Sequence, residues 1–313
     1  MSTSRVLLLS TSPGGENYAR MSVLCALPGI EVDSIALNEK IAVQIGDVTY
    51  VEQAGRKFSL DDYDLAIWWP ASFQYMRRRL GAFYFPDAGQ EYGSRAWRVI
   101  EEGLLATTGA LLNTYTSSIL AANKVYVMHA ANKVGIPVPP SSIGNIASAP
   151  SSAKRVVIKT LTDTMDIDDT QKILTTEVDP GSLNGAIDGI PAIYQQRIDL
   201  DFEVRACYFD GLTTSIELRW PPGAESQSDI RLFKPEDVRM AVVDHPEAER
   251  YNALLAKRLN LRMFCADYLV DRAGKTWLTD VNPHGSWHWL ALSAREVVDG
   301  QFGAMIKRIL GRG

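Results

Sequence analysis

The sequence contains few of the residues that disulfide frameworks and zinc sites require. Its 313 residues include only three cysteines, Cys25, Cys207 and Cys265, which are far apart in the chain and form no Cys-x-x-Cys pair. An odd number of widely spaced cysteines indicates buried thiols in a reducing compartment. The four histidines also lack metal-ligand spacing, so the pattern gives no indication of a metal bound by thiolates or imidazoles.

Long apolar runs are missing as well. The apolar run nearest the N-terminus covers only residues 6–9, which is too short for a signal-peptide core. No run approaches the roughly 18 apolar residues of a membrane span. With 37 acidic and 32 basic residues, the net charge of −5 argues against bulk binding to nucleic acid or to an anionic membrane. We therefore expect a soluble, cytoplasmic protein with neither of these partners.

The length and the order of the apolar runs predict two differently built halves. A prior of about 150 residues per domain gives roughly two domains. In the first part, short apolar strands alternate with a helical period, which predicts a parallel α/β sheet over about the first 115 residues. The strands expected there cover residues 6–9, 65–69 and 111–113, and the helix falls between residues 90 and 108.

The C-terminal half is expected to be α+β with an antiparallel sheet. Asp210 and Gly211 join two alternating runs, which is a strong hairpin signal. Before this half, Ser118 is expected to cap a helix that Gly135 ends. The remaining elements are strands at residues 192–198, 202–209, 213–220, 263–270 and 276–281, and helices at about 247–259 and 294–310.

Three oxygen-bearing side chains are expected on one face of the last hairpin. A four-residue loop at residues 272–275 would place Asp267 directly opposite Asp280. Asn282, two residues further on, leaves the same face of its strand. Facing carboxylates repel unless a cation lies between them, and three oxygen ligands suit Mg²⁺. The alternative is a solvated acidic face, which the apolar and aromatic neighbours disfavour.

Several charged residues are ambiguous when each is taken alone. Lys159 ends the apolar run at residues 156–158, where it either meets an anion such as phosphate or extends into solvent. Lys124 is typical of a solvated position in the middle of a helix. Glu203 and Arg205, two residues apart, are typical of a surface ion pair, and Arg231 of a surface arginine.

Taken in order, these features resemble the ATP-grasp superfamily of carboxylate–amine ligases. Within it, the sequence is most similar to the ligases that make graspetides, the microviridin-type ribosomal peptides, and the resemblance spans about residues 60–292. The motifs that carry it are Ile-Trp-Trp at residues 67–69, Lys124 before Gly-Ile-Pro-Val-Pro, Lys159, Tyr-Gln-Gln-Arg-Ile at 194–198, Glu-Val-Arg at 203–205, Ser-Asp-Ile-Arg at 228–231, Asp267, and Asp-Val-Asn-Pro at 280–283 followed by Gly285, Ser286 and Trp287.

The resemblance implies a fold and a division of the chain. A Rossmann-like pre-ATP-grasp domain would cover residues 1–117. The two lobes of an ATP-grasp domain would follow, the small lobe at residues 118–191 and the large lobe at 192–313. A homodimer is left open.

The resemblance also implies a site for ATP and Mg²⁺. Lys124 and Lys159 would hold the phosphates, and the backbone of a hinge formed by Gln195, Gln196, Arg197 and Ile198 would meet the adenine. Asp199 or Asp201 would lie near the ribose, and Glu203 belongs to the same cofactor-binding set. Mg²⁺ would be bound by Asp267, Asp280 and Asn282, with Asp280 standing where the family usually has Glu. Arg205 and Arg231 match positions close to the transferred phosphate.

The implied reaction activates a carboxylate as an acyl-phosphate, which an amine or hydroxyl then attacks. No Ser-His or Cys-His signature, P-loop or Gly-x-Gly-x-x-Gly occurs, which fits an enzyme without a covalent nucleophile. The favoured substrate and partner is a ribosomal precursor peptide that acquires side-chain ester or amide bonds. The alternatives are a small-molecule or amino-acid ligase of the glutathione-synthase or peptide-tailing kind, and a nucleotide-binding regulatory protein without turnover.

Overall fold

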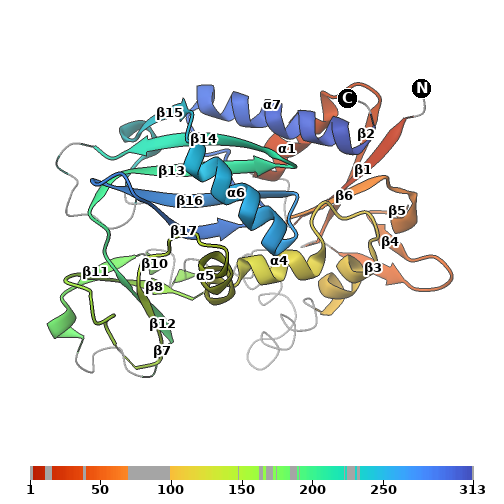
Figure 1. Ribbon diagram of the computed structural model, residues 1–313. Coiled ribbons are helices and arrows are strands. Elements are labelled where there is room, and N and C mark those ends of the chain that lie inside the picture. Colours follow the sequence, from red (N-terminus) through yellow and green to blue (C-terminus); the bar gives the residue numbers. More distant parts are fainter. Residues whose placement is uncertain are drawn as a thin grey trace. The chain divides into compact units, whose positions relative to one another are not determined.

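The chain forms a mixed α/β structure with several sheets (Figure 1). This computed structural model describes residues 3–10, 16–37, 40–69, 99–146, 148–161, 165–166, 172–173, 175–183, 189, 191–221, 223, 230 and 233–311. It divides into two compact units: unit 1 is Met1–Ser118, Ser286–His288 and Asp299–Gly313, and unit 2 is Ile119–Gly285 and Trp289–Val298. The finer division that the sequence predicts, at residues 117/118 and 191/192, stays a prediction.

Unit 1 contains a parallel sheet, as the alternating pattern predicts. The strand order is β2-β1-β6, with both outer strands parallel to β1. The strand expected at residues 111–113 is only a single parallel bridge between Leu111 and Ala66, since the chain turns toward the next helix directly afterwards. Residues 99–107 are helical, and the earlier part of the expected helix lies outside the described residues. The elements are β1 (Ser4–Ser10), α1 (Glu16–Cys25), β2 (Ile30–Ala36) and β6 (Leu65–Trp68).

A small antiparallel sheet in unit 1 was not predicted. It consists of β3 (Ile41–Gln44), β4 (Tyr50–Gln53) and β5 (Arg56–Ser59), and the short helix η1 (Leu60–Asp62) follows. Ala54 and Gly55 turn the chain from β4 to β5 with φ of 51° and 75°. Hairpins of this kind are usually indicated by Asn-Gly or Asp-Gly. Here the first turn residue is alanine, which rarely adopts a positive φ, so the turn has no such signal in the sequence.

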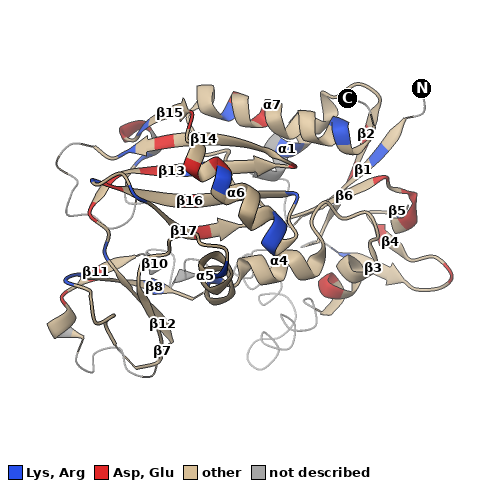
Figure 2. Cartoon of the chain, viewed as in Figure 1, with Lys and Arg blue, Asp and Glu red and all other residues tan. Residues whose placement is uncertain are grey.

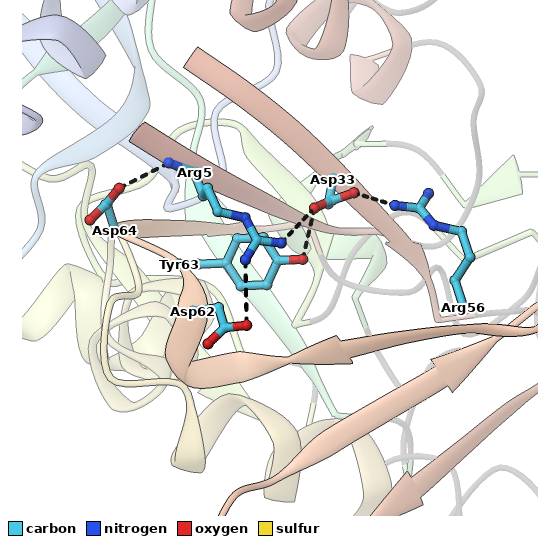
Figure 3. Close-up of polar contacts among 6 residues, drawn as sticks. All are labelled: Arg5, Asp33, Arg56, Asp62, Tyr63 and Asp64. Carbon is cyan, nitrogen blue, oxygen red and sulfur yellow. Dashed lines mark hydrogen bonds and ion pairs between the residues drawn. The ribbon is translucent and has the colours of Figure 1, made fainter. Parts of the chain in front are cut away.

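A polar cluster centred on Asp33 ties the strands of unit 1 together (Figure 3). Its carboxylate accepts hydrogen bonds from Arg56 at 2.6 Å, Tyr63 at 3.0 Å and Arg5 at 3.2 Å. Asp33 lies on β2, so these bonds connect β2 to β1, to β5 and to the residue after η1. Partial burial by itself would raise the pKa of Asp33, but the three hydrogen bonds outweigh it and hold the pKa below its usual value.

We expect Asp33→Asn to lower the free energy of unfolding by about 1–2 kcal/mol, because Asn keeps the shape but loses the charge that the arginines neutralise. The folded pKa of Asp33 is the lower one. Its contribution is therefore present above the unfolded pKa of about 3.9 and is lost as the pH falls through the folded pKa. Urea unfolding at about pH 7 and about pH 3 measures both effects. Asp47→Asn, at an exposed turn residue, is the control, and equal losses for the two variants at neutral pH would contradict the assignment.

The helix expected after Ser118 is in fact two helices, α4 (Tyr115–Ala122) and α5 (Lys124–Lys133). Ser118 lies inside the first, which crosses the boundary in sequence between unit 1 and unit 2. Asn123 separates them, because its side chain accepts the backbone N–H three residues later at 3.0 Å and so caps α5. The prediction that Lys124 occupies the middle of a helix is therefore wrong: it is the first residue of α5.

The smaller of the two main sheets of unit 2 has the order β11-β8-β12-β7. Its core cluster is built from Val156, Leu183, Ala192 and Tyr194. The expected strand at residues 192–198 ends at residue 196. The elements of this region are β7 (Ser141–Gly144), β8 (Val156–Thr160), β9 (Met165–Asp166), β10 (Lys172–Ile173), β11 (Thr176–Val178), η2 (Pro180–Ser182) and β12 (Ala192–Gln196), with β9 and β10 paired separately.

The larger sheet of unit 2 is antiparallel, as predicted, with the order β15-β14-β13-β16-β17. Asp210 and Gly211 form the expected hairpin turn, with φ of 49° and 103°. One face of the sheet packs against α5 and α6, which lies across the strands in Figure 1. The elements are β13 (Leu200–Phe209), β14 (Leu212–Arg219), η4 (Pro235–Asp237), β15 (Arg239–Val243), α6 (Pro246–Leu259), β16 (Met263–Asp271) and β17 (Thr276–Asn282). The last helix, α7 (Leu292–Ile309), belongs to unit 2 up to Val298 and to unit 1 from Asp299 on. Among the described residues, no helix is both long and apolar enough to cross a bilayer.

The cysteines agree with the prediction of buried thiols at two positions of three. Cys207 on β13 and Cys265 on β16 are cross-strand neighbours, fully buried, with their Sγ atoms 2.9 Å apart. Burial raises the pKa of the Cys207 thiol well above its usual value. The prediction is wrong for Cys25, which is exposed at the end of α1 because Leu24 fills the core-facing position there.

Two fully buried tyrosines of unit 2 differ in what their hydroxyl groups meet. Tyr268 donates to Oδ1 of Asn252 at 2.7 Å, whereas the hydroxyl of Tyr194 has no hydrogen-bond partner among the described residues. We expect Tyr194→Phe to leave the free energy of unfolding unchanged or raise it by up to about 1 kcal/mol. Tyr268→Phe should lower it by about 1–3 kcal/mol, because Asn252 loses a buried partner. Urea unfolding of both variants measures the difference, and a larger loss for Tyr194→Phe than for Tyr268→Phe would refute it.

Candidate functional site

The candidate site lies on the face of the larger sheet that faces away from α5 and α6. The strand register places Arg205 of β13 opposite Asp267 of β16, and Asp267 opposite Asp280 of β17. Cross-strand partners share a face, so these three side chains emerge together. The pairing of the two carboxylates confirms the hairpin prediction.

The register of that hairpin differs from the prediction nearer the loop. Tyr268 pairs with Leu278 rather than with Thr279, and the register shifts by one residue before Asp267 meets Asp280. Thr279 is therefore an extra residue, a β-bulge, that the loop length did not reveal. Beyond it, Asn282 occupies the same face as Asp280, and its Oδ1 accepts the backbone N–H of His284 at 3.0 Å.

Arg205 and Asp267 form a close ion pair. One guanidinium nitrogen of Arg205, Nη1, donates to both carboxylate oxygens of Asp267, at 2.7 and 3.0 Å. Burial would lower the pKa of Arg205, but the charge of Asp267 more than compensates and raises the pKa, so the guanidinium stays positive. Its buried Nε has no partner among the described residues, and the ring of Trp289 lies 5.6 Å from the guanidinium carbon. Arg205 thus keeps one donor that no described residue accepts.

Two lysines bring positive charge to Asp280. Lys124, at the start of α5, donates to the carbonyl of Thr160 at 3.4 Å, and Lys159 lies on β8 next to Thr160. Removal from water raises the pKa of Asp280. The positive charges of Lys124 and Lys159 lower this pKa and the negative charge of Asp267 raises it, so that the pKa of Asp280 is raised overall. The structure therefore brings Lys124, Lys159 and both carboxylates within electrostatic reach of one another.

The hinge residues mostly make structural contacts with their side chains. The Gln195 amide is buried and donates to Oγ of Ser141 at 3.0 Å, and Gln196 accepts from Oγ of Ser152 at 3.3 Å. The backbone is different: in the described part of the chain, the N–H of Ile198 has no acceptor.

An ion-pair cluster fixes this hinge, and sequence analysis missed it. Nε of Arg197 lies 2.7 Å from a carboxylate oxygen of Glu177 on β11, and Arg155 pairs with the other oxygen. The backbone N–H of Arg197 also donates to the carbonyl of Arg155 at 2.9 Å. The side chain of Arg197 therefore positions the hinge. Glu177 gave no sequence signal, because its partners are distant along the chain.

The acidic residues after the hinge have polar partners of their own. Asp199 is 77% exposed and pairs with Arg272 at 3.5 Å, and Asp201 pairs with Arg219 at 3.4 Å. Glu203 accepts a hydrogen bond from the indole N–H of Trp220 at 3.1 Å, which the sequence did not indicate. Their roles toward a nucleotide stay predictions.

Some predicted residues lie outside the described part of the chain. Arg231 is one of them, together with residues 228–229 and most of the loop after Lys159. Elsewhere, Lys and Arg positions are interspersed with Asp and Glu positions along the strands and helices (Figure 2), in keeping with the small net charge.

Comparison with solved structures shows the fold. No protein-family model and no curated protein matches the sequence. The macrocyclase MdnC from Microcystis aeruginosa MRC, bound to precursor peptide MdnA, is similar at a TM-score of 0.78 and 16% identity, covering 97% of this chain and 99% of that one. A Chryseobacterium gregarium RiPP-associated ATP-grasp ligase, in complex with ADP and a leader and core peptide, is similar at a TM-score of 0.78 and 16% identity. The match covers 99% of this chain and 98% of that one.

The likeness extends to a synthetase whose name gives a different product. D-alanyl-alanine synthetase A from Vibrio cholerae gives a TM-score of 0.62 at 14% identity, with 100% of this chain and 99% of that chain covered. The chain therefore has the fold of the ATP-grasp ligases over its whole length, which confirms at the level of fold the resemblance that the ordered motifs indicated.

Proposed function

We propose that this protein is an ADP-forming ATP-grasp ligase that modifies a ribosomal precursor peptide. It activates a side-chain carboxylate of the peptide as an acyl-phosphate and joins it to a hydroxyl or amine of the same peptide. The observation that carries this proposal is the cluster of facing Asp267 and Asp280 with Arg205, Lys124 and Lys159, in a chain with this fold. The peptide substrate is inferred from the precursor and core peptides bound to the similar ligases.

The donor set fits Mg²⁺. Two carboxylates and one amide oxygen on one sheet face are hard oxygen ligands, and phosphate and water oxygens would complete the octahedron. Asp280 is partly buried beside a second carboxylate, an arrangement whose free-energy cost a cation offsets. Asp267, Asp280 and Asn282 would hold the ion, which would neutralise phosphate charge.

The surrounding cations and the hinge fit ATP. Lys124 and Lys159 would bind its phosphates. The N–H of Ile198, which has no acceptor among the described residues, offers a donor to a ring nitrogen of adenine. Glu177 keeps that stretch of backbone in place through Arg197. Asp199 or Asp201 would lie near the ribose, and Glu203 would belong to the same nucleotide-binding set. We assign the parallel sheet of unit 1 to a Rossmann-like pre-ATP-grasp domain.

The side chains of the site stabilise charge and supply no covalent nucleophile. Arg205 is positive, buried and fixed by Asp267, so it is preorganised to offset negative charge on an acyl-phosphate with little rearrangement. Trp289 covers the guanidinium on one side and would limit access of water there. The acceptor must then be held next to the acyl-phosphate, which a hydroxyl or amine on the same peptide chain satisfies.

We expect Lys159→Ala to weaken binding of a non-hydrolysable ATP analogue by roughly 10- to 100-fold, since a charge-assisted hydrogen bond to phosphate is lost. The free energy of unfolding should hardly change, because Lys159 is only partly buried and lies next to the last residue of β8. Titration calorimetry with Mg²⁺ present measures the affinity, and Lys154→Ala, at an exposed residue nearby, is the control. Equal affinity in both variants would show that Lys159 only extends into solvent.

Incubation with the cognate precursor peptide, ATP and Mg²⁺ tests the function. The expected product is lighter by one water per bond formed, and fragmentation should be suppressed inside the linked segment. Asp280→Asn should abolish both the mass change and ADP release, whereas Asp280→Glu, which keeps a carboxylate, should retain more activity.

The other outcomes separate the alternatives. A product heavier by an added amino acid would identify a peptide-tailing ligase. ADP release that requires a small acid and leaves the peptide unchanged would identify a small-molecule ligase. Nucleotide binding without any turnover would leave the regulatory role.

A further inference from the structure

Along strand β17, the regular alternation of side chains between the two faces of the sheet is interrupted between two core residues. Leu278 and Val281 both belong to the core cluster under α5 and α6. In a regular strand, residues three apart point to opposite faces. The bulge at Thr279 resolves this conflict, because two residues, Thr279 and Asp280, lie opposite the single residue Asp267.

The packing of the core does not require the extra residue. A strand without Thr279 would pair regularly, with Leu278 opposite Tyr268 and Asp280 opposite Asp267, and Leu278 and Val281 would still share the core face. What the extra residue changes is local: a bulge bends its strand and increases its twist. Here that change falls between the core residue Leu278 and the proposed metal ligand Asp280.

The side chain of Thr279 fastens the bulge to the site. Its hydroxyl donates to the backbone carbonyl of Asp267 at 3.0 Å. Thr279 is therefore covalently next to one proposed ligand and hydrogen-bonded to the backbone of the other. Its side chain is partly buried, so the bond is shielded from water in part.

We propose that Thr279 is a positioning residue, which holds Asp280 and Asp267 at the separation that a divalent cation requires. The inference rests on the proposed function, because it concerns the Mg²⁺ site of the same ligase. Thr279 acts through the two carboxylates and does not itself bind the ion.

Three variants test the proposal. Thr279→Val removes the hydroxyl but keeps the branched shape, Thr279→Ser restores a hydroxyl, and deletion of Thr279 removes the bulge. Mg²⁺ is titrated by calorimetry into the complex of the protein with a non-hydrolysable ATP analogue. Urea unfolding without metal reports stability, and the Mg²⁺ dependence of ADP release gives a kinetic counterpart.

We expect Thr279→Val to weaken Mg²⁺ binding by about tenfold, the size typical of losing a group that orients a metal ligand, and Thr279→Ser to bind close to the wild type. The deletion should lose more affinity while unfolding at a similar urea concentration. If the deletion variant does not fold, the Val and Ser variants decide. Mg²⁺ affinity in Thr279→Val equal to that of the wild type would overturn the inference. Wild-type protein that binds no Mg²⁺ with the analogue would instead overturn the proposed function.

Discussion

The repulsion between two facing carboxylates is the constraint around which unit 2 is arranged. Asp267 and Asp280 occupy opposed positions on neighbouring strands, where like charges destabilise a sheet. The next strand supplies Arg205 to Asp267, while α5 and β8 bring Lys124 and Lys159 close to Asp280. The break between α4 and α5 belongs to the same arrangement, because it puts Lys124 at the end of α5 that carries the positive pole of the helix.

Much of the fold could be predicted because the period of the apolar residues is local information. The parallel strands of unit 1, the Asp210–Gly211 turn and the last hairpin follow from alternation and turn chemistry. The errors in the prediction occur where a single residue determines a helix boundary, a turn or a strand register. Asn123 ends one helix and caps another, Ala54 takes a positive φ that its side chain disfavours, and Thr279 adds one residue to a strand.

The site could be predicted only in part, since its partners are brought together by pairing across long stretches of chain. Loop arithmetic paired Asp267 with Asp280, which share one hairpin, although the register next to the loop differs by one residue and the bulge at Thr279 restores the pair. It could not connect Arg205 to Asp267, which are 62 positions apart, or Glu177 to Arg197. A bulge between Leu278 and Val281 was readable in principle, because two apolar residues three apart do not fit one face of a strand.

The residues proposed to bind ATP and Mg²⁺ are divided between two sheets that differ in the size of their cores. The smaller sheet, with Lys159 and the hinge, has a core of few buried residues, whereas the carboxylates lie on the larger sheet, over a much more extensive core. A ligand that contacts both sheets adds its binding free energy to the cost of opening the smaller one. The backbone amides of β8 and β12 would then exchange hydrogen with solvent more slowly in the complex. The binding of substrate would thus contribute to the free energy that keeps the smaller sheet folded.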